Sequence, residues 1–305
     1  GRVKALADES HSKGLKFGIY SSSGHRTCLG NAASYDYEFE DAETFASWGV
    51  DFLKYDFCHR PESPSAAYTY RKMGAALANS GRDILFSACS WGMEETQKWI
   101  KTTDASMWRS TGDINDSWES IKNIALQQTE LQTYNGIGCF NDMDMLVVGM
   151  YGKGNVGLEG LNDTQYKTHF SIWALLGSPL MIGCDIRNMN DETLKILTNR
   201  ELIKINQDEA CRQIFKLTNI WDGNVKAYAK NLENGDIALG FFNFGSAAAI
   251  VRVNLDELGL PESTGKTLCM RNVWEDETVT VKNGTIIHDI QPYDCLVYRC
   301  SVIDK

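Results

Sequence analysis

Residues 50–58 read Val-Asp-Phe-Leu-Lys-Tyr-Asp-Phe-Cys, a mostly apolar run that leads into a lysine and an aspartate. In an extended strand, alternation places Lys54 and Asp56 on one face, and Leu53 and Tyr55 on the other. This pattern is typical of a strand in a parallel α/β barrel, which packs through its middle and carries polar chemistry at its carboxyl end. An ordinary buried strand whose last two charges reach solvent would show the same pattern, so the flanking sequence must decide.

Apolar strand-like runs alternate with helical patterns on both sides of this stretch. The expected helices cover residues 3–13, 40–48, 66–79, 94–101, 117–131, 164–176 and 191–206. The other expected strands cover residues 15–20, 84–88, 105–109, 142–148 and 179–183. Strands that alternate with helices of this length predict a parallel sheet, here with six strands, and polar residues follow nearly every one of them.

The pattern changes after about Asp208, where short alternating runs replace the helices. These runs cover residues 225–229, 237–242, 249–253, 278–281 and 296–298. Asn234-Gly235, between the first two runs, is a typical hairpin turn. The sequence therefore predicts two domains: an α/β barrel over residues 1–208 and a C-terminal antiparallel β-sandwich over residues 209–305.

Composition limits the classes of partner. The chain has 305 residues, 43% of them hydrophobic, and a formal net charge of −10. The negative charge argues against binding to nucleic acid or to an anionic membrane surface, and no apolar run reaches the roughly 18 residues of a membrane span. Residues 1–6 do not resemble a signal peptide but the middle of a helix, so the cellular compartment stays unassigned, secreted or cytoplasmic.

The nine cysteines are scattered and form no metal-type Cys-x-x-Cys pair. Their odd number leaves at least one thiol free, and in a core of this size most are expected to be small buried hydrophobes.

Candidate chemical groups gather at the ends of the expected strands. They are Tyr20, Lys54, Asp56, Ser90, Trp91, Arg109, Asp113, Asp142 and Asp144. Two carboxylates that work with cations and aromatic faces suit glycoside hydrolysis. Nearby Lys54 and Arg109 would keep Asp56 ionised, as a nucleophile requires, whereas a less compensated Asp113 would stay protonated as the acid. Composition by itself does not choose which carboxylates are catalytic, and each tryptophan could equally belong to the core.

Several ordered segments of the first 208 residues resemble glycoside hydrolase family 27, the α-galactosidase and α-N-acetylgalactosaminidase family. They are His11-Ser12-Lys13-Gly14-Leu15-Lys16-Phe17-Gly18-Ile19-Tyr20-Ser21, Phe45-Ala46-Ser47-Trp48-Gly49-Val50-Asp51, Lys54-Tyr55-Asp56, Trp108-Arg109, Gly112-Asp113-Ile114, Asn141-Asp142-Met143-Asp144-Met145-Leu146, Ser178-Pro179-Leu180-Met181-Ile182-Gly183 and Ile205-Asn206-Gln207-Asp208. The sandwich fits the family's second domain more loosely.

The resemblance implies a (β/α)8 TIM barrel and a retaining mechanism. Asp56 matches the nucleophile, which would form a covalent glycosyl-enzyme, and Asp113 matches the acid/base, which would protonate the leaving oxygen and then deprotonate water. The resemblance also implies a cysteine pair, Cys28 and Cys58, that is disulfide-bonded in secreted relatives.

The resemblance further implies contacts with the sugar. The expected substrate-binding residues are Tyr20, Lys54, Ser90, Trp91, Arg109 and Asp144, with structural support for Arg109 as the alternative role of Asp144. No metal or organic cofactor is expected, because the side chains supply both the acid and the nucleophile. The expected partner is a small or oligosaccharide α-galactoside, not a nucleic acid or a membrane, and a homo-oligomer stays open.

Two departures from the family matter. Two barrel strands that carry a tryptophan and a pair of aspartates would precede Gly1, so a fragment, or a truncated non-catalytic family member, is an alternative. The second departure is Ser90, where galactosidases usually carry glutamate and N-acetylgalactosamine enzymes carry serine. We therefore expect release of terminal α-linked galactose, with α-N-acetylgalactosaminidase activity as the alternative. Release of isomaltose or β-L-arabinopyranose is a weaker one.

Overall fold

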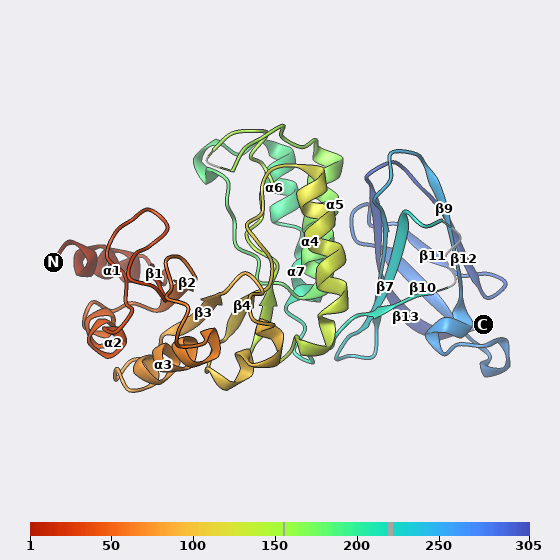
Figure 1. The fold of residues 1–305 in the computed structure, drawn as a ribbon. Helices are drawn as coiled ribbons and strands as arrows, with labels where there is room; N and C mark the ends of the chain where they lie inside the picture. The colour runs from red at the N-terminus through yellow and green to blue at the C-terminus, as the bar shows by residue number, and fades with distance from the viewer. Residues whose placement is uncertain (155, 219–221) are drawn as a thin grey trace. The chain divides into compact units, whose positions relative to one another are not determined.

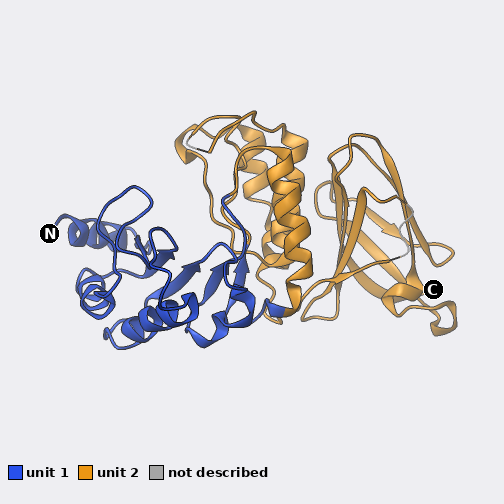
Figure 2. Cartoon of the chain, in the orientation of Figure 1, with its two compact units in different colours: residues 1–113, 134–142 blue, residues 114–133, 143–305 orange. Residues whose placement is uncertain are grey.

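The computed structural model describes residues 1–154, 156–218 and 222–305; residues 155 and 219–221, which fall in the two predicted domains, lie outside it. The chain forms two compact units (Figure 2). Unit 1 comprises residues 1–113 and 134–142, and unit 2 comprises residues 114–133 and 143–305. This division differs from a boundary at residue 208 because helices before that residue pack with the sandwich, and the domain boundary stays a prediction.

Unit 1 is built on a parallel sheet of five strands that follow one another in chain order (Figure 1). They are β1 (Gly18–Ser22), β2 (Phe52–Asp56), β3 (Leu85–Cys89), β4 (Met107–Arg109) and β5 (Phe140–Asp142). The helices of this unit are α1 (Arg2–Ser12), α2 (Glu38–Ser47) and α3 (Ala66–Ala78), with 3-10 turns η1 (Thr96–Lys98) and η2 (Ile100–Thr102). The 3-10 turn η3 (Gln132–Tyr134) begins in residues of unit 2 and ends at Tyr134 of unit 1. Short parallel strands joined by helices are the arrangement that the alternation predicts.

The two faces of this sheet have different roles. Leu53 and Tyr55 of β2 are fully buried, and the Tyr55 ring packs edge-on against Tyr70 of α3, with ring centroids 5.4 Å apart. Phe86 of β3 stacks on the same Tyr70 ring. This aromatic contact commits one face to helix packing, so Lys54 and Asp56 lie on the opposite face.

Three local expectations were wrong. The expected helix over residues 94–101 consists of two 3-10 turns. The expected strand over residues 142–148 is β5, which ends at Asp142; beyond it, Asp144 has a φ of +76°, outside the extended region. The expected strand over residues 179–183 is reduced to one parallel bridge between Leu146 and Ile182, so the described residues contain five parallel strands instead of six.

Unit 2 joins a group of helices to an antiparallel sandwich. Its helices are α4 (Trp118–Glu130), α5 (Asp163–Leu176), α6 (Asp191–Leu197) and α7 (Arg200–Asn206), with 3-10 turns η4 (Ile186–Asn188), η5 (Leu255–Leu258) and η6 (Glu262–Thr264). Helix α5 is buried on all sides from Thr168 to its end, and Trp173 shares a core with Phe242 and Val297 of the sandwich. A helix buried all round is expected where it packs between layers.

The sandwich contains a six-stranded sheet and a two-stranded sheet. The first has the order β11 (Thr278–Thr280), β10 (Lys266–Asn272), β13 (Cys295–Asp304), β8 (Ile237–Asn243), β7 (Val225–Asn231) and β6 (Phe215–Lys216), and the second pairs β12 (Thr285–Ile290) with β9 (Ala249–Asn254). Asn234-Gly235 lies in the β7–β8 turn as expected, with Gly235 at a φ of +87°. The predicted fold class, a parallel α/β domain followed by an antiparallel β-sandwich, is confirmed. No helix of the described residues is both long and apolar enough to cross a membrane.

Candidate active site

A row of polar side chains crosses the sheet of unit 1 at the carboxyl ends of its strands. Strand register aligns Ser22, Asp56, Cys89, Arg109 and Asp142, one from each of the five strands. In-register residues of parallel strands point to the same face, so the register brings together groups that are up to 120 residues apart in sequence. All five are buried. The predicted gathering of polar groups at the strand ends is therefore present for Asp56 and Arg109.

Asp56 is held by hydrogen-bond donors. The Tyr20 hydroxyl donates to Oδ2 at 2.6 Å, and the Phe57 backbone N–H donates to Oδ1 at 2.8 Å. No lysine or arginine nitrogen of the described residues lies within 4.0 Å of this carboxylate. Its direct contacts are therefore neutral donors, and the expectation that Lys54 and Arg109 keep Asp56 ionised stays a prediction.

The contact with Asp56 changes the pKa of Tyr20. The residue is 41% exposed, while its hydroxyl donates to the buried carboxylate. Burial, together with the hydrogen bond to Asp56, raises the pKa of Tyr20 well above its ordinary value. Tyr20 therefore keeps its proton at neutral pH and remains a hydrogen-bond donor to Asp56.

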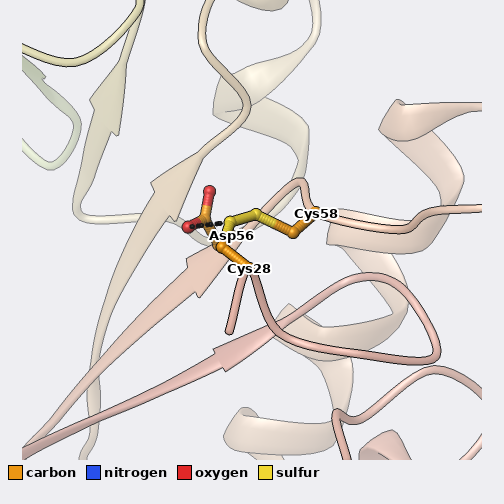
Figure 3. A group of neighbouring side chains, drawn as sticks. All are labelled: Cys28, Asp56 and Cys58. Carbon is orange, nitrogen blue, oxygen red and sulfur yellow. Dashed lines mark hydrogen bonds between the residues drawn. A yellow bond between two sulfur atoms is a disulfide. The ribbon is translucent and has the colours of Figure 1, made fainter. Parts of the chain in front are cut away.

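A disulfide lies directly beside Asp56. It joins Cys28, in the loop after β1, to Cys58, two residues beyond Asp56, as the resemblance implied (Figure 3). The Cys28 sulfur lies 3.6 Å from Oδ2 of Asp56, and this is a van der Waals contact because a disulfide sulfur carries no proton. The disulfide therefore fastens the β1 loop next to the carboxylate.

The residues around the disulfide are poorly suited to bind a metal ion. In the described part of the chain, Cys28, Asp56 and Cys58 form the one set of three potential ligand residues with donor atoms close together. Cysteine binds metals as a thiolate, and the disulfide removes both thiolates. One carboxylate remains, which is too few ligands for a dedicated metal site.

Arg109 contacts Asp113 instead of Asp56. Its guanidinium is 1% exposed, and Nη2 lies 3.0 Å from Oδ1 of Asp113, whose side chain is 74% exposed. The expectation that Asp113 is the less compensated carboxyl is wrong, because it is the one with a cation beside it. The register explains the error, since Cys89 separates Arg109 from Asp56 in the row.

Lys54 shares a face with Asp56 and is half-buried, without an ion pair to any described residue. Its charge and that of Arg109 act on Cys89, which lies between them. Burial raises the pKa of the Cys89 thiol well above its usual value, and the two cations oppose this only in part. Cys89 is therefore a neutral thiol in the centre of the row.

Ser90 and Trp91 follow Cys89 directly. Ser90 is fully buried, and its hydroxyl lies 2.5 Å from the hydroxyl of Thr96. Trp91, at a φ of +58°, packs edge-on against Phe57 with ring centroids 5.6 Å apart. Gly92 is required here, because a Cβ would come within 2.3 Å of the Ser110 carbonyl.

Asp144 belongs to unit 2, where its carboxylate accepts two backbone hydrogen bonds. Oδ2 accepts from the N–H of Ile114 at 2.8 Å, and Oδ1 accepts from the N–H of Met145 at 2.7 Å. Its own carbonyl accepts from the indole of Trp173 at 2.9 Å. These contacts fix the turn after β5, and a sugar-binding role for Asp144 stays a prediction.

Sequence reasoning missed the groups that hold the candidate residues. They are the Phe57 amide, the Thr96 hydroxyl and the carbonyls of Thr111 and Gly112, which both accept from Arg109. Most are backbone groups, which are present at every residue and so cannot be recognised from the sequence. The contact between Ser90 and Thr96 could not be predicted either, because it depends on the folded path of the loop between them.

Comparison with known proteins identifies what the chain is similar to. The family model described as "Alpha galactosidase A" matches residues 1–208, and the model of the α-galactosidase C-terminal β-sandwich domain matches residues 222–300. The α-galactosidase of Cyamopsis tetragonoloba is 41% identical over 297 residues, which cover 97% of this chain and 69% of that protein.

Solved structures share the architecture. A Bacteroides fragilis protein with a provisional α-galactosidase/melibiase assignment matches with a TM-score of 0.91 and 39% identity, over 98% of this chain and 65% of that one. An α-galactosidase from Saccharomyces cerevisiae with raffinose, 24% identical, matches with a TM-score of 0.83 over 99% of this chain and 83% of its own length. The chain thus spans about two thirds of the length of the first two of these relatives.

Proposed function

Because this chain belongs to the α-galactosidase family, glycoside hydrolase family 27, we propose that the protein hydrolyses terminal α-linked galactosides with retention of configuration. Asp56 is the nucleophile and Asp113 is the acid/base. The observation that supports the proposal is the setting of Asp56: a buried carboxylate at a strand end, held by two neutral donors, with no lysine or arginine nitrogen of the described residues within 4.0 Å.

The two chemical steps follow from these roles. In the first, an Asp56 oxygen bonds to the anomeric carbon while the glycosidic C–O bond breaks and Asp113 gives its proton to the leaving oxygen. In the second, water attacks the anomeric carbon, Asp113 takes the water proton, and the bond to Asp56 breaks. The hydroxyl of Tyr20 holds the carboxylate in line for attack and receives it again after the second step.

In this proposal Lys54 and Trp91 serve sugar recognition, and Arg109 supports the acid/base. Lys54 lies two residues before Asp56 on the same face of β2. Its ammonium group, which has no ion-pair partner among the described residues, is offered to ring hydroxyls. Trp91 offers an aromatic face near Phe57, and sugar rings pack well on such faces. The buried guanidinium of Arg109 acts through its contact with Asp113.

The test is the configuration of the first product together with the identity of the labelled residue. Proton NMR on a fresh reaction with an α-galactoside should show α-galactose before mutarotation. A fluorinated galactosyl fluoride, which slows the second step, should label the peptide that contains Asp56 and not a peptide that contains only Asp51. Release of β-galactose first, or a label on another residue, would overturn the assignment.

A second candidate, α-N-acetylgalactosaminidase, is supported by Ser90, a small residue whose hydroxyl is engaged with Thr96. In the resembling family, a serine here leaves room for the acetamido group and a glutamate would clash with it. The change Ser90→Glu should then suppress hydrolysis of α-N-acetylgalactosaminide far more than that of α-galactoside, because added bulk acts only where the acetamido group fits. Ser90→Ala is the matched control and should leave the ratio of the two rates unchanged. Equal losses after Ser90→Glu would remove Ser90 as the selector.

A further inference from the structure

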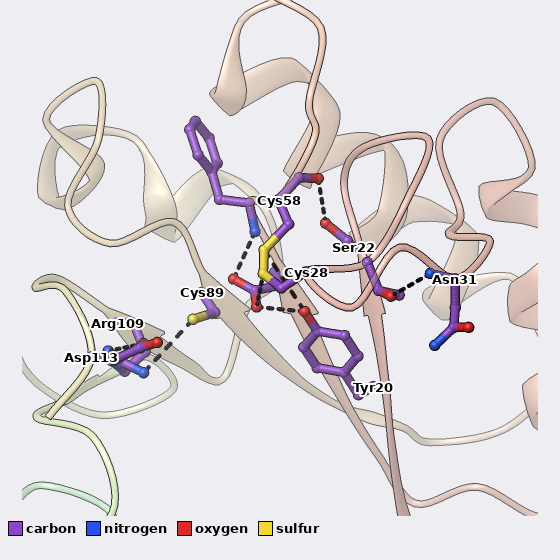
Figure 4. The surroundings of a disulfide bond; sticks show 11 residues. Tyr20, Ser22, Cys28, Asn31, Cys58, Cys89, Arg109 and Asp113 are labelled. Carbon is purple, nitrogen blue, oxygen red and sulfur yellow. Dashed lines mark hydrogen bonds and ion pairs between the residues drawn. A yellow bond between two sulfur atoms is a disulfide. The ribbon is translucent and has the colours of Figure 1, made fainter. Parts of the chain in front are cut away.

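Cys89 occupies an unusual position for a cysteine without a partner. It is fully buried at the end of β3, in register with Asp56 on one side and Arg109 on the other. The Nη1 group of Arg109 donates to its sulfur at 3.8 Å (Figure 4). The mechanism proposed above gives this thiol no part, so its contact with Arg109 calls for an explanation.

The other end of the same guanidinium reaches the loop after β4. Nη2 lies 3.2 Å from the Thr111 carbonyl, 2.9 Å from the Gly112 carbonyl and 3.0 Å from Oδ1 of Asp113. Three acceptors share the two N–H bonds of this one nitrogen. Arg109 thus shapes the backbone that carries Asp113 as well as contacting its carboxylate.

A planar guanidinium transmits its orientation from one end to the other. The fork is rigid, so the position of Nη1 fixes the position of Nη2. The sulfur of Cys89 is large and only weakly polar, and it fills the space beside Nη1 while accepting its hydrogen. The Asp113 side chain is exposed, so its position depends on the contact with the buried Arg109 guanidinium.

We propose that Cys89 is a positioning residue for the acid/base: it seats the Arg109 guanidinium, which in turn holds the 111–113 loop and the Asp113 carboxylate. The proposal rests on the role assigned to Asp113 above. Cys89 does not act as a nucleophile, because burial keeps its thiol protonated. In this role it acts through Arg109 and not directly on the reacting atoms.

The leaving group separates this role from mere packing. A 2,4-dinitrophenolate departs with little help from an acid, whereas methanol or a sugar needs a proton from Asp113. Poor placement of Asp113 therefore slows the first step with methyl α-galactoside and spares 2,4-dinitrophenyl α-galactoside. A cavity in the core or a partly unfolded population would slow both substrates alike.

The experiment compares kcat/KM on both substrates for Cys89→Ala and Cys89→Ser in the intact protein. Cys89→Ala should lower kcat/KM roughly tenfold or more on the methyl galactoside and only about twofold on the dinitrophenyl galactoside, because small misplacements of catalytic groups are costly. Cys89→Ser keeps an acceptor for Nη1 and should recover most of the lost rate. The matched control is Cys139→Ala, another buried thiol of unit 1, which should change neither rate.

Equal losses of kcat/KM on the two substrates, or no loss on either, would overturn the proposal. A Cys89→Ser variant with no higher kcat/KM than Cys89→Ala would also overturn it. If melting curves show Cys89→Ala to be unfolded, Arg109→Lys replaces it: this change keeps the charge but loses the fork, and an equal effect on both substrates would again count against the proposal. Asp113→Ala is the reference. If Asp113→Ala does not slow hydrolysis of the methyl galactoside more than that of the dinitrophenyl galactoside, the assignment of Asp113 as the acid fails, whatever the Cys89 variants show.

Discussion

Asp51 and Asp56 lie at opposite ends of strand β2, and both carboxylates are largely buried, yet their surroundings differ. Asp51 precedes the strand, and its side chain is 9% exposed. Asp56 ends the strand and is 7% exposed. Because strand and burial are shared, the difference between the two sites comes from the partners that surround each carboxylate.

Asp51 is saturated with partners. Its Oδ2 lies 2.7 Å from His11 and accepts from the Phe17 N–H at 2.8 Å, while Oδ1 lies 2.7 Å from Arg82 and 3.7 Å from Lys16. Burial opposes ionisation, but the hydrogen bonds from Phe17, His11 and Arg82 outweigh it and hold the pKa of Asp51 well below its usual range. A carboxylate has about four lone-pair sites, and here all have partners.

Among the described residues, Asp56 has two hydrogen-bond donors and no ion-pair partner, so lone pairs remain for an incoming carbon atom. The comparison teaches that burial and charge do not mark a reactive carboxylate; unused acceptor capacity does. Cavity volume would also mislead. Two cavities of about 830 and 340 Å³ reach Asp51, and neither is lined by Asp56. In parallel barrels the amino-terminal end of the sheet serves stability, and the carboxyl end serves chemistry.

The largest expected effect is on turnover. Asp56→Asn should lower kcat by roughly a thousandfold or more, since removal of a nucleophile is rarely compensated. Its melting temperature should stay close to that of the unmodified protein, because no ion pair is lost. Steady-state kinetics on a preparation free of unmodified enzyme would measure this, and near-normal activity would move the nucleophile elsewhere.

The reciprocal change at the other end of the strand should act on stability. Asp51→Asn should reduce the free energy of unfolding by about 2 to 3 kcal/mol, as expected for lost hydrogen bonds to a charged group. Activity per folded molecule should persist. Denaturant titration alongside kinetics would test both parts, and a loss of kcat like that of Asp56→Asn would erase the distinction between the two ends.

A smaller effect is expected at Tyr20. Tyr20→Phe removes the hydroxyl that donates to Asp56 and should lower kcat about tenfold, the equivalent of one hydrogen bond of about 1.4 kcal/mol. Tyr35→Phe is a suitable control, since the described side-chain contact of Tyr35 is a ring contact with His25, which phenylalanine keeps. An unchanged kcat for Tyr20→Phe would mean that the Phe57 amide positions Asp56 without help.

The smallest expected effect is a change with acid pH in the contribution of Asp51 to stability. The folded pKa of Asp51 is depressed, so its stabilising contribution is complete above the unfolded pKa of about 3.9 and is lost as the pH falls toward the folded value. The difference in unfolding free energy between the unmodified protein and Asp51→Asn should therefore shrink as the pH falls below about 4. A difference that grows on acidification would reverse the assigned sign.

Regular elements with a clear period were predictable from the sequence. Helices α3 and α4, strands β2 and β3, and the Asn234-Gly235 turn lie within a few residues of their expected positions. Strands β6, β10 and β12 were missed. β10 mixes buried and half-buried positions without strict alternation, and β6 is only two residues long, so neither carries a period to detect.

The sequence by itself determined the alternation of strands and helices, the antiparallel sandwich, and the place of Asp56 at a strand end, because hydrophobic period and turn chemistry act over a few neighbouring residues. Only the tertiary structure decided that Arg109 contacts Asp113, that Tyr20 holds Asp56, and that His11 and Arg82 saturate Asp51. Those partners are set by strand register and by side-chain reach across distant segments. A change of one position in register would have turned each side chain to the other face of the sheet.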